Sequence, residues 1–197
     1  MRIINPYNTV LIFDWDDTLL PINWLHTKGV RQGQSINISE DIAVELEILD
    51  EMCFRVLKQA QNLGKVVIVT NSTNGWVETS STIFLPKVHE FLAKIEVISA
   101  PENFPHLSIK DCKVEVFKQL IKDNILNVLS FGDSFNDRDS LFLAIEDNPS
   151  IYSKSFKFLR TPNINELKNQ IQILINKLEE LCKISTNLDM VLIVKND

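Results

Sequence analysis

The sequence has little of what a disulfide framework, a zinc site or a nucleic-acid surface requires. Its 197 residues contain three cysteines, far apart and without a C-x-x-C pair, and three histidines without ligand-like spacing. An odd number of separated cysteines predicts reduced thiols in the core of a cytoplasmic protein. The formal net charge of −6 leaves no basic stripe, so no nucleic-acid partner is expected.

Long hydrophobic runs are also missing. No apolar run reaches the roughly 18 residues of a membrane-spanning helix, so no transmembrane segment is expected. The first expected strand begins too close to Met1 to leave room for a signal peptide. With 45% hydrophobic residues, the chain suits one α/β domain, expected over residues 1–180. Residues 181–197 form a tail that the pattern does not define and that could lead into a further region.

Short apolar runs alternate with amphipathic stretches along the chain. Strands are expected at residues 10–13, 65–69, 95–98, 127–131 and 156–159. Helices are expected at 39–64, at 75–93 with a break at Pro86, at 111–123 and after Asn163. We read residues 19–34 as a flap and 99–108 as a loop. The alternation predicts a Rossmann-like α/β fold with a five-stranded parallel sheet and helices on both faces.

The first strand ends abruptly in carboxylates. Asp14 and Asp16 follow the apolar run Val10–Phe13, and ligands of open α/β sheets bind outside the carboxyl ends of the strands. Two carboxylates so close together repel each other unless a cation lies between them. Mg²⁺ is the usual partner, held by carboxylates and by phosphate oxygens of a substrate. The alternative is a strand followed by an ordinary acidic turn.

Later strand ends and one helix carry matching polar residues. Thr70 and Asn71 follow the second strand, Lys113 opens a helix, and G-D-x-x-x-D follows the fourth strand at 132–137. With D-x-D-x-T at 14–18, this ordered set resembles the four motifs of the haloacid dehalogenase-like superfamily, in its phosphatase branch. The third motif is a single lysine, so Lys110 competes with Lys113. The resemblance favours Lys113, because members of the superfamily commonly carry this lysine at the start of a helix with an aromatic residue one turn later, here Phe117. Receiver domains share the residue types but not their order.

The resemblance implies a phosphatase that works through an aspartyl-phosphate. Asp14 is then the nucleophile, and Asp16 is the acid and base for the leaving group and for water. The implied Mg²⁺ ligands are the Asp14 carboxylate, the Asp16 backbone carbonyl and Asp133, with Asp137 assisting. Thr70, Asn71 and Lys113 are the implied phosphate-binding residues.

The substrate class depends on an expected absence. Too few residues separate the motifs for a sizeable cap domain, which predicts a site open to a phosphorylated protein or peptide, most favourably phosphotyrosine. Trp15, Trp24 and Phe135 are candidates to line the site, and Trp76 is a further one, although packing is the ordinary role of such side chains. Two alternatives stay open. One is a small-molecule phosphatase capped by a neighbouring subunit, and the other is a silent module that binds phosphorylated partners.

Two longer stretches sharpen the resemblance. F-D-W-D-D-T-L-L-P at 13–21 and T-N-x-x-x-G-W-V-E at 70–78 are similar to uncapped members of the superfamily, some of them tyrosine phosphatases that bacteria deliver into host cells. The tail is less informative. Its leucines and isoleucines repeat at steps of four and three from Leu167 to Leu181, which suits either core packing or a homodimeric coiled coil.

Overall fold

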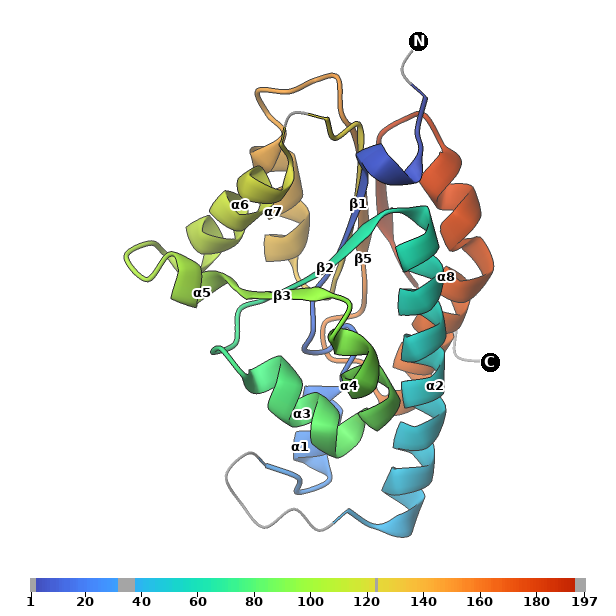
Figure 1. Cartoon of the computed structure of the whole chain (residues 1–197). Helices are drawn as coiled ribbons and strands as arrows, with labels where there is room; N and C mark the ends of the chain where they lie inside the picture. Colours follow the sequence, from blue (N-terminus) through green and yellow to red (C-terminus); the bar gives the residue numbers. More distant parts are fainter. Residues whose placement is uncertain (1–2, 32–37, 123, 194–197) are drawn as a thin grey trace.

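The chain folds around one parallel β-sheet (Figure 1). In this computed structural model, which describes all residues except 1–2, 32–37, 123 and 194–197, six strands lie in the order β3-β2-β1-β4-β5-β6. They are β1 (Thr9–Phe13), β2 (Lys65–Thr70), β3 (Glu96–Ser99), β4 (Asn127–Gly132), β5 (Tyr152–Lys157) and β6 (Leu188–Val191). Every neighbouring pair is parallel. The predicted parallel sheet is confirmed, and the predicted number of five strands is wrong because β6 adds a sixth.

The central strands are buried on both faces, as continuous apolar runs predict. Val10 and Ile12 of β1 belong to one hydrophobic cluster, and Phe13 belongs to the other. On the second face the ring of Phe131 stacks between two neighbours, with centroids 4.6 Å from Phe13 and 5.0 Å from Phe156. These stacked rings fix β1, β4 and β5 side by side just before the strands end.

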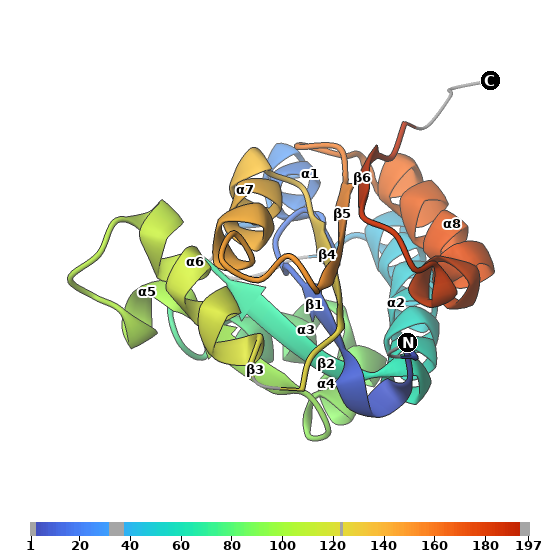
Figure 2. The same cartoon turned by 90° about the horizontal axis from the view of Figure 1, so that it is seen from above.

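Helices cover both faces of the sheet (Figure 2). On one face lie α2 (Glu40–Leu63) and α8 (Ile164–Lys183), and on the other lie α6 (Ile109–Leu120) and α7 (Phe135–Ala144). The shorter helices are η1 (Pro6–Asn8), α1 (Ile22–Thr27), α3 (Trp76–Phe84), α4 (Pro86–Leu92) and α5 (Ala100–Asn103). Pro86 is the first residue of α4, so the predicted break in the 75–93 helix is confirmed.

Three local predictions differ from the structure. Residues 19–34 contain α1, a helix too short to show a periodic pattern, and residues 32–34 of this stretch lie outside the described chain. Strand β5 begins at Tyr152, not at Phe156, because its buried Ser153, Lys154 and Ser155 do not form an apolar run. The predicted loop at 99–108 contains the short helix α5. Helix α7 was not predicted, because it has no regular apolar stripe.

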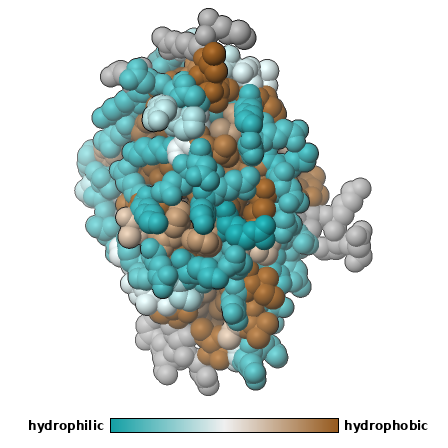
Figure 3. Space-filling view, turned by 45° about the vertical axis from the view of Figure 1, so that its right-hand side comes forward, coloured by the Kyte–Doolittle hydropathy of each residue, from teal (hydrophilic) through white to brown (hydrophobic). Residues whose placement is uncertain are grey.

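Most of the apolar repeat in α8 packs inside the protein. Four of its residues are fully buried in the core: Leu167, Ile171, Leu174 and Leu178. Hydrophilic side chains cover most of the face on which α2 and α8 lie (Figure 3). This is the core packing that we considered, and a homodimer through α8 stays a prediction. No helix in the described part of the chain combines the length and the apolar character that a bilayer crossing requires.

The order of the strands places a crevice at one edge of the sheet. From β1 the chain moves outward to β2 and β3, and it then returns to β4 on the other side of β1. Ligands of sheets with this order bind outside the carboxyl ends at the reversal. Helix α1 lies beyond these ends, and no further domain is inserted over them in the residues that the structure covers.

Candidate active site

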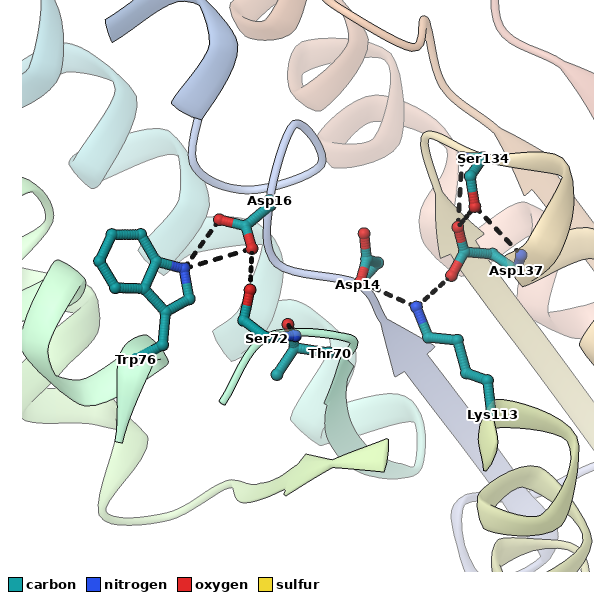
Figure 4. A network of polar contacts seen from close by, with 8 residues as sticks. All are labelled: Asp14, Asp16, Thr70, Ser72, Trp76, Lys113, Ser134 and Asp137. Carbon is teal, nitrogen blue, oxygen red and sulfur yellow. Dashed lines mark hydrogen bonds and ion pairs between the residues drawn. The ribbon is translucent and has the colours of Figure 1, made fainter. Parts of the chain in front are cut away.

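A cavity of about 590 Å³ opens at the carboxyl ends of β1, β2 and β4. Its lining contains five of the predicted catalytic, phosphate-binding and metal-binding residues: Asp14, Asp16, Thr70, Asn71 and Asp133. Two more lie next to this lining, on one face of the sheet: Lys113 of α6 contacts Asp14, and Asp137 of α7 contacts Lys113 (Figure 4). Polar residues that are far apart in the sequence therefore meet in the folded chain.

Lys113 is a buried cation between two carboxylates. Its side chain is 1% exposed, and Nζ donates to Asp14 Oδ1 at 2.9 Å and to Asp137 Oδ1. Only Oδ1 of Asp14 has a hydrogen-bond partner among the described residues, so Oδ2 is left for a ligand in the cavity. A cation at this position stabilises the two carboxylates and leaves one oxygen of Asp14 available.

The structure distinguishes the two candidate lysines. Helix α6 begins at Ile109, directly after Ser108, whose hydroxyl caps the helix. Lys113 therefore lies in the second turn, whereas the sequence predicted the first turn. Lys113 shares the buried face of α6 with Phe117, four residues on. Lys110 points outward, and its Nζ lies 3.7 Å from Asp139 Oδ2.

Asp137 is held by the start of α7. It is the third residue of this helix, and its Oδ2 accepts a hydrogen bond from the backbone N–H of Ser134 at 3.2 Å, while its own N–H donates to Ser134 Oγ. This reciprocal capping box orients the carboxylate toward Lys113. Gly132 leaves room for it, because a Cβ there would lie 2.5 Å from Asp137 Cβ. The glycine of the G-D-x-x-x-D motif is thus required by the volume of the second aspartate.

The site carries more negative than positive charge. Burial raises the pKa of Asp14 well above its usual value, and the nearby Lys113 ammonium opposes this effect only in part. Burial, with Asp137 and Asp17 close by, raises the pKa of Asp133 to about 7. Burial alone would lower the pKa of Lys113, but Asp137 and Asp14 outweigh it and the pKa is raised. The lysine therefore stays charged, while the carboxylates need protons or another cation.

The carboxylates suit a hard divalent cation. Oxygen atoms of Asp14, Asp133 and Asp137 all lie within 4.8 Å of one another. Carboxylate oxygens are the ligands that Mg²⁺ prefers. Both oxygens of Asp137 already accept hydrogen bonds from Lys113 or Ser134, so Asp14 and Asp133 are the better placed ligands and Asp137 assists. These oxygen donors fit the predicted Mg²⁺. That the backbone carbonyl of Asp16 is a further ligand stays a prediction.

Mg²⁺ binding is expected to strengthen as the pH rises. Asp133, with a pKa of about 7, must lose its proton before it can hold a cation, so protons compete with Mg²⁺ below that pH. If Mg²⁺ binding releases one proton, the affinity for Mg²⁺ should rise about tenfold per pH unit below about pH 7. Above this pH the affinity should change less. Calorimetric titration across this range measures the effect. An affinity independent of pH, or one retained by Asp133→Asn, would contradict the assignment.

Asp16 lies in the same cavity but faces away from Lys113. Its Oδ2 accepts a hydrogen bond from Ser72 Oγ at 2.7 Å, and its Oδ1 accepts one from the indole Nε1 of Trp76 at 2.9 Å. Figure 4 shows the resulting division into two groups, one around Lys113 and one around Asp16. The two carboxylates of the first motif therefore have separate supports, which allows them separate chemical roles.

The end of β2 lies between these two groups (Figure 4). Thr70 is 2% exposed, and its Oγ1 accepts a hydrogen bond from the backbone N–H of Ser72 at 3.0 Å. Asn71 is exposed and lines the cavity. Both are placed to meet a ligand at the carboxyl end of β2.

Asp17 is a site residue for which sequence reasoning gave no role. It has a left-handed backbone conformation with φ of 55°, and its N–H donates to Leu20 O at 2.7 Å. Its buried Oδ1 accepts a hydrogen bond from the backbone N–H of Asn23, in the first turn of α1, at 3.1 Å. Asp17 therefore turns the chain after β1 and holds α1 beside the cavity. The same loop brings His26, to which we assigned no role, into the lining.

Two of the predicted aromatic residues, Trp15 and Trp24, lie outside the cavity lining. Trp15 is fully buried and donates its indole N–H to Ser80 Oγ at 2.9 Å, so it cannot meet a substrate. Trp24 packs partly against the core and borders a different hollow with Ser39 and Asn163. Trp76 is the tryptophan that lines the cavity, and its position depends on the packing of α3, which no local sequence signal gives.

Phe135 lies beside the cavity, not in it. Its side chain is 63% exposed and borders a hollow of about 220 Å³ together with Lys157 and Arg160. Lys157 Nζ is 4.8 Å from the centroid of the Phe135 ring. The hollow and the cavity share Asp133 in their linings, so a ligand that extends from the cavity can reach this ring.

Comparisons with known proteins give no family. No family model matches the chain, and no solved structure matches it. Human carboxypeptidase D is 27% identical over 124 residues, which is 60% of this chain. The matched part makes up only 9% of the length of that protein. This likeness is too distant and too partial to assign the chain to a family.

Proposed function

We propose that the protein is a Mg²⁺-dependent phosphatase of the haloacid dehalogenase-like superfamily that acts through an aspartyl-phosphate. The observation that carries the proposal is that two separately held carboxylates line one cavity. Asp14 has one oxygen without a hydrogen-bond partner among the described residues and the other paired with buried Lys113, and Asp16 is held by Ser72. The four motifs and the order of the strands support it further. The partial likeness to human carboxypeptidase D adds no function.

The chemistry follows from the two groups of residues. Asp14 attacks phosphorus as the bond to the leaving oxygen breaks, and Asp16 gives that oxygen its proton. Water then attacks the phosphorus of the aspartyl-phosphate and passes a proton to Asp16. The bond between phosphorus and the Asp14 oxygen breaks, so phosphate is released and Asp14 is restored. Lys113 balances the charge on Asp14 during both steps, and Thr70 and Asn71 are placed to contact the phosphoryl oxygens. Mg²⁺ held by Asp14 and Asp133 would supply positive charge to these oxygens.

The substrate that we propose is a phosphotyrosine side chain on a protein or peptide. No inserted domain covers the cavity in the described chain, so a residue on a large partner can enter. Phe135 and Trp76 offer aromatic contacts for a phenyl ring at the edge of the cavity and inside it. Lys157 and Arg160 beside Phe135 favour acidic residues next to the phosphotyrosine.

Hydrolysis of a phosphotyrosine peptide is expected to require Mg²⁺ and to stop when EDTA is added. Its kcat/KM should be at least as high as that of a sugar phosphate, because no lid selects small ligands. Phosphate release from both substrates, with Mg²⁺ and with EDTA, measures this. Turnover without metal would overturn the mechanism. A preference for the sugar phosphate would instead favour a small-molecule enzyme capped by a neighbouring subunit, and no turnover of any ester would favour the silent binding module.

A further inference from the structure

We propose that Trp76 is a positioning residue for Asp16, and that its indole N–H and the hydroxyl of Ser72 together set the direction of the general acid. This inference rests on the proposed function, because it assigns a task within that reaction. It gives a task in that reaction to two residues, Ser72 and Trp76, which are not among the aspartates, the threonine and the lysine of the four motifs.

The contacts to Asp16 come from two sides. Ser72 Oγ donates to Oδ2 at 2.7 Å, and Trp76 Nε1 donates to Oδ1 at 2.9 Å and lies 3.2 Å from Oδ2. Ser72 lies in the loop after β2, and Trp76 is the first residue of α3. Two donors from different directions leave the carboxylate little freedom to rotate, so it faces the cavity in one orientation.

Trp76 is itself held in place. It is 9% exposed, and its backbone carbonyl accepts a hydrogen bond from Ser80 Oγ at 2.7 Å. The same hydroxyl accepts the indole N–H of Trp15 at 2.9 Å, and Trp15 stands between Asp14 and Asp16 in the chain. The first motif is thus tied to α3 at two points, through Trp15 to Ser80 and through Asp16 to Trp76. A side chain supported in this way can orient another one.

Two esters with different leaving groups can distinguish a loss of Asp16 positioning from a general disturbance of the site. Phenol is a poorer leaving group than 4-nitrophenol, so hydrolysis of phenyl phosphate depends more on proton donation by Asp16. Trp76→Phe keeps the aromatic ring and removes the N–H donor. We expect kcat/KM for phenyl phosphate to fall about tenfold more than kcat/KM for 4-nitrophenyl phosphate, as the loss of one hydrogen bond to a charged group predicts. Ser72→Ala should shift the ratio in the same direction.

Matched variants complete the test. Trp24→Phe makes the same change outside the cavity and should leave the ratio unchanged, and Ser72→Thr should restore what Ser72→Ala loses. In an Asp16→Asn background, Trp76→Phe should shift the ratio no further. Equal losses on the two esters, or a gain on phenyl phosphate, would overturn the positioning role while the proposed function stands. A wild-type protein that hydrolyses neither ester would overturn both.

A measurement without turnover tests the contact itself. In ¹⁵N-labelled protein, Asp16→Ala should shift the indole signal of Trp76, assigned from Trp76→Phe, because the side chain that accepts its hydrogen bond is gone. The indole of Trp24 should keep its position. An unmoved Trp76 signal would show that the hydrogen bond is absent in solution and would overturn the proposal.

Discussion

Replacing Asp14 with asparagine is expected to lower kcat for aryl phosphate hydrolysis by about 10³-fold or more, because the amide cannot form an aspartyl-phosphate. The fold should survive, since the side-chain carbonyl of asparagine can still accept the hydrogen bond that Lys113 gives to Oδ1. Phosphate release gives kcat, and circular dichroism checks the fold. Peptide mass spectrometry after rapid acid quench should find the phosphoryl group on Asp14 in the wild-type protein only.

Asp50→Asn provides the control for this experiment. Asp50 is a buried carboxylate outside the cavity that accepts hydrogen bonds from the backbone N–H groups of Lys87 and Val88 at the start of α4. The same chemical change at this position should leave kcat close to the wild-type value. If Asp14→Asn keeps kcat within about tenfold of wild type, another group is the nucleophile.

Lys113→Met is expected to lower the free energy of unfolding by about 3–5 kcal/mol and to remove activity. The change leaves the buried carboxylates of Asp14 and Asp137 without their shared cation, and an uncompensated buried charge costs this amount. Urea denaturation near neutral pH measures the loss. The loss should shrink at low pH, because the raised pKa of Asp14 lets that carboxylate take up a proton, after which it needs no counter-ion.

Lys110→Met is the matched control on the same helix. Lys110 is 47% exposed, and its ion pair with Asp139 is long, so the substitution should change the free energy of unfolding by less than about 1 kcal/mol. Equal effects of the two substitutions would mean that the ion pairs of Lys113 add nothing to the stability of the fold.

The sequence predicted the parts of the site that local signals define. Asp14 and Asp133 directly follow apolar strands, so their place at the sheet edge follows from the strands alone. Lys113 needed a second signal, because Lys110 lies closer to the start of α6. The spacing of four residues to buried Phe117 places Lys113 on the inner face of the helix. Lys110, seven residues before Phe117, is compatible with the same face, so the preference for Lys113 depended on the resemblance to the superfamily. The ion pairs in the fold separate the two lysines, because Lys113 meets Asp14 and Lys110 lies near partly exposed Asp139.

The parts that sequence reasoning missed depend on distant partners. Strand β5 was placed too late because Lys154 lies within it, and a lysine rarely occupies a core. In the fold its Nζ donates to Asn127 Oδ1 at 2.7 Å and to the carbonyl of Cys182 at 2.9 Å. No local pattern reveals these acceptors. Likewise, whether Trp15 or Trp76 faces the cavity depends on how α3 packs.

Asp137 combines three tasks that a substitution cannot separate. The same carboxylate caps α7, pairs with Lys113 and fills the space that Gly132 leaves open. Any replacement there removes a helix cap and a buried counter-ion at once, so lost activity would say nothing about metal ligation. Asp133 is half-buried and has no hydrogen-bond partner in the described part of the chain. A substitution of Asp133 therefore tests metal binding without removing a hydrogen bond or a counter-ion.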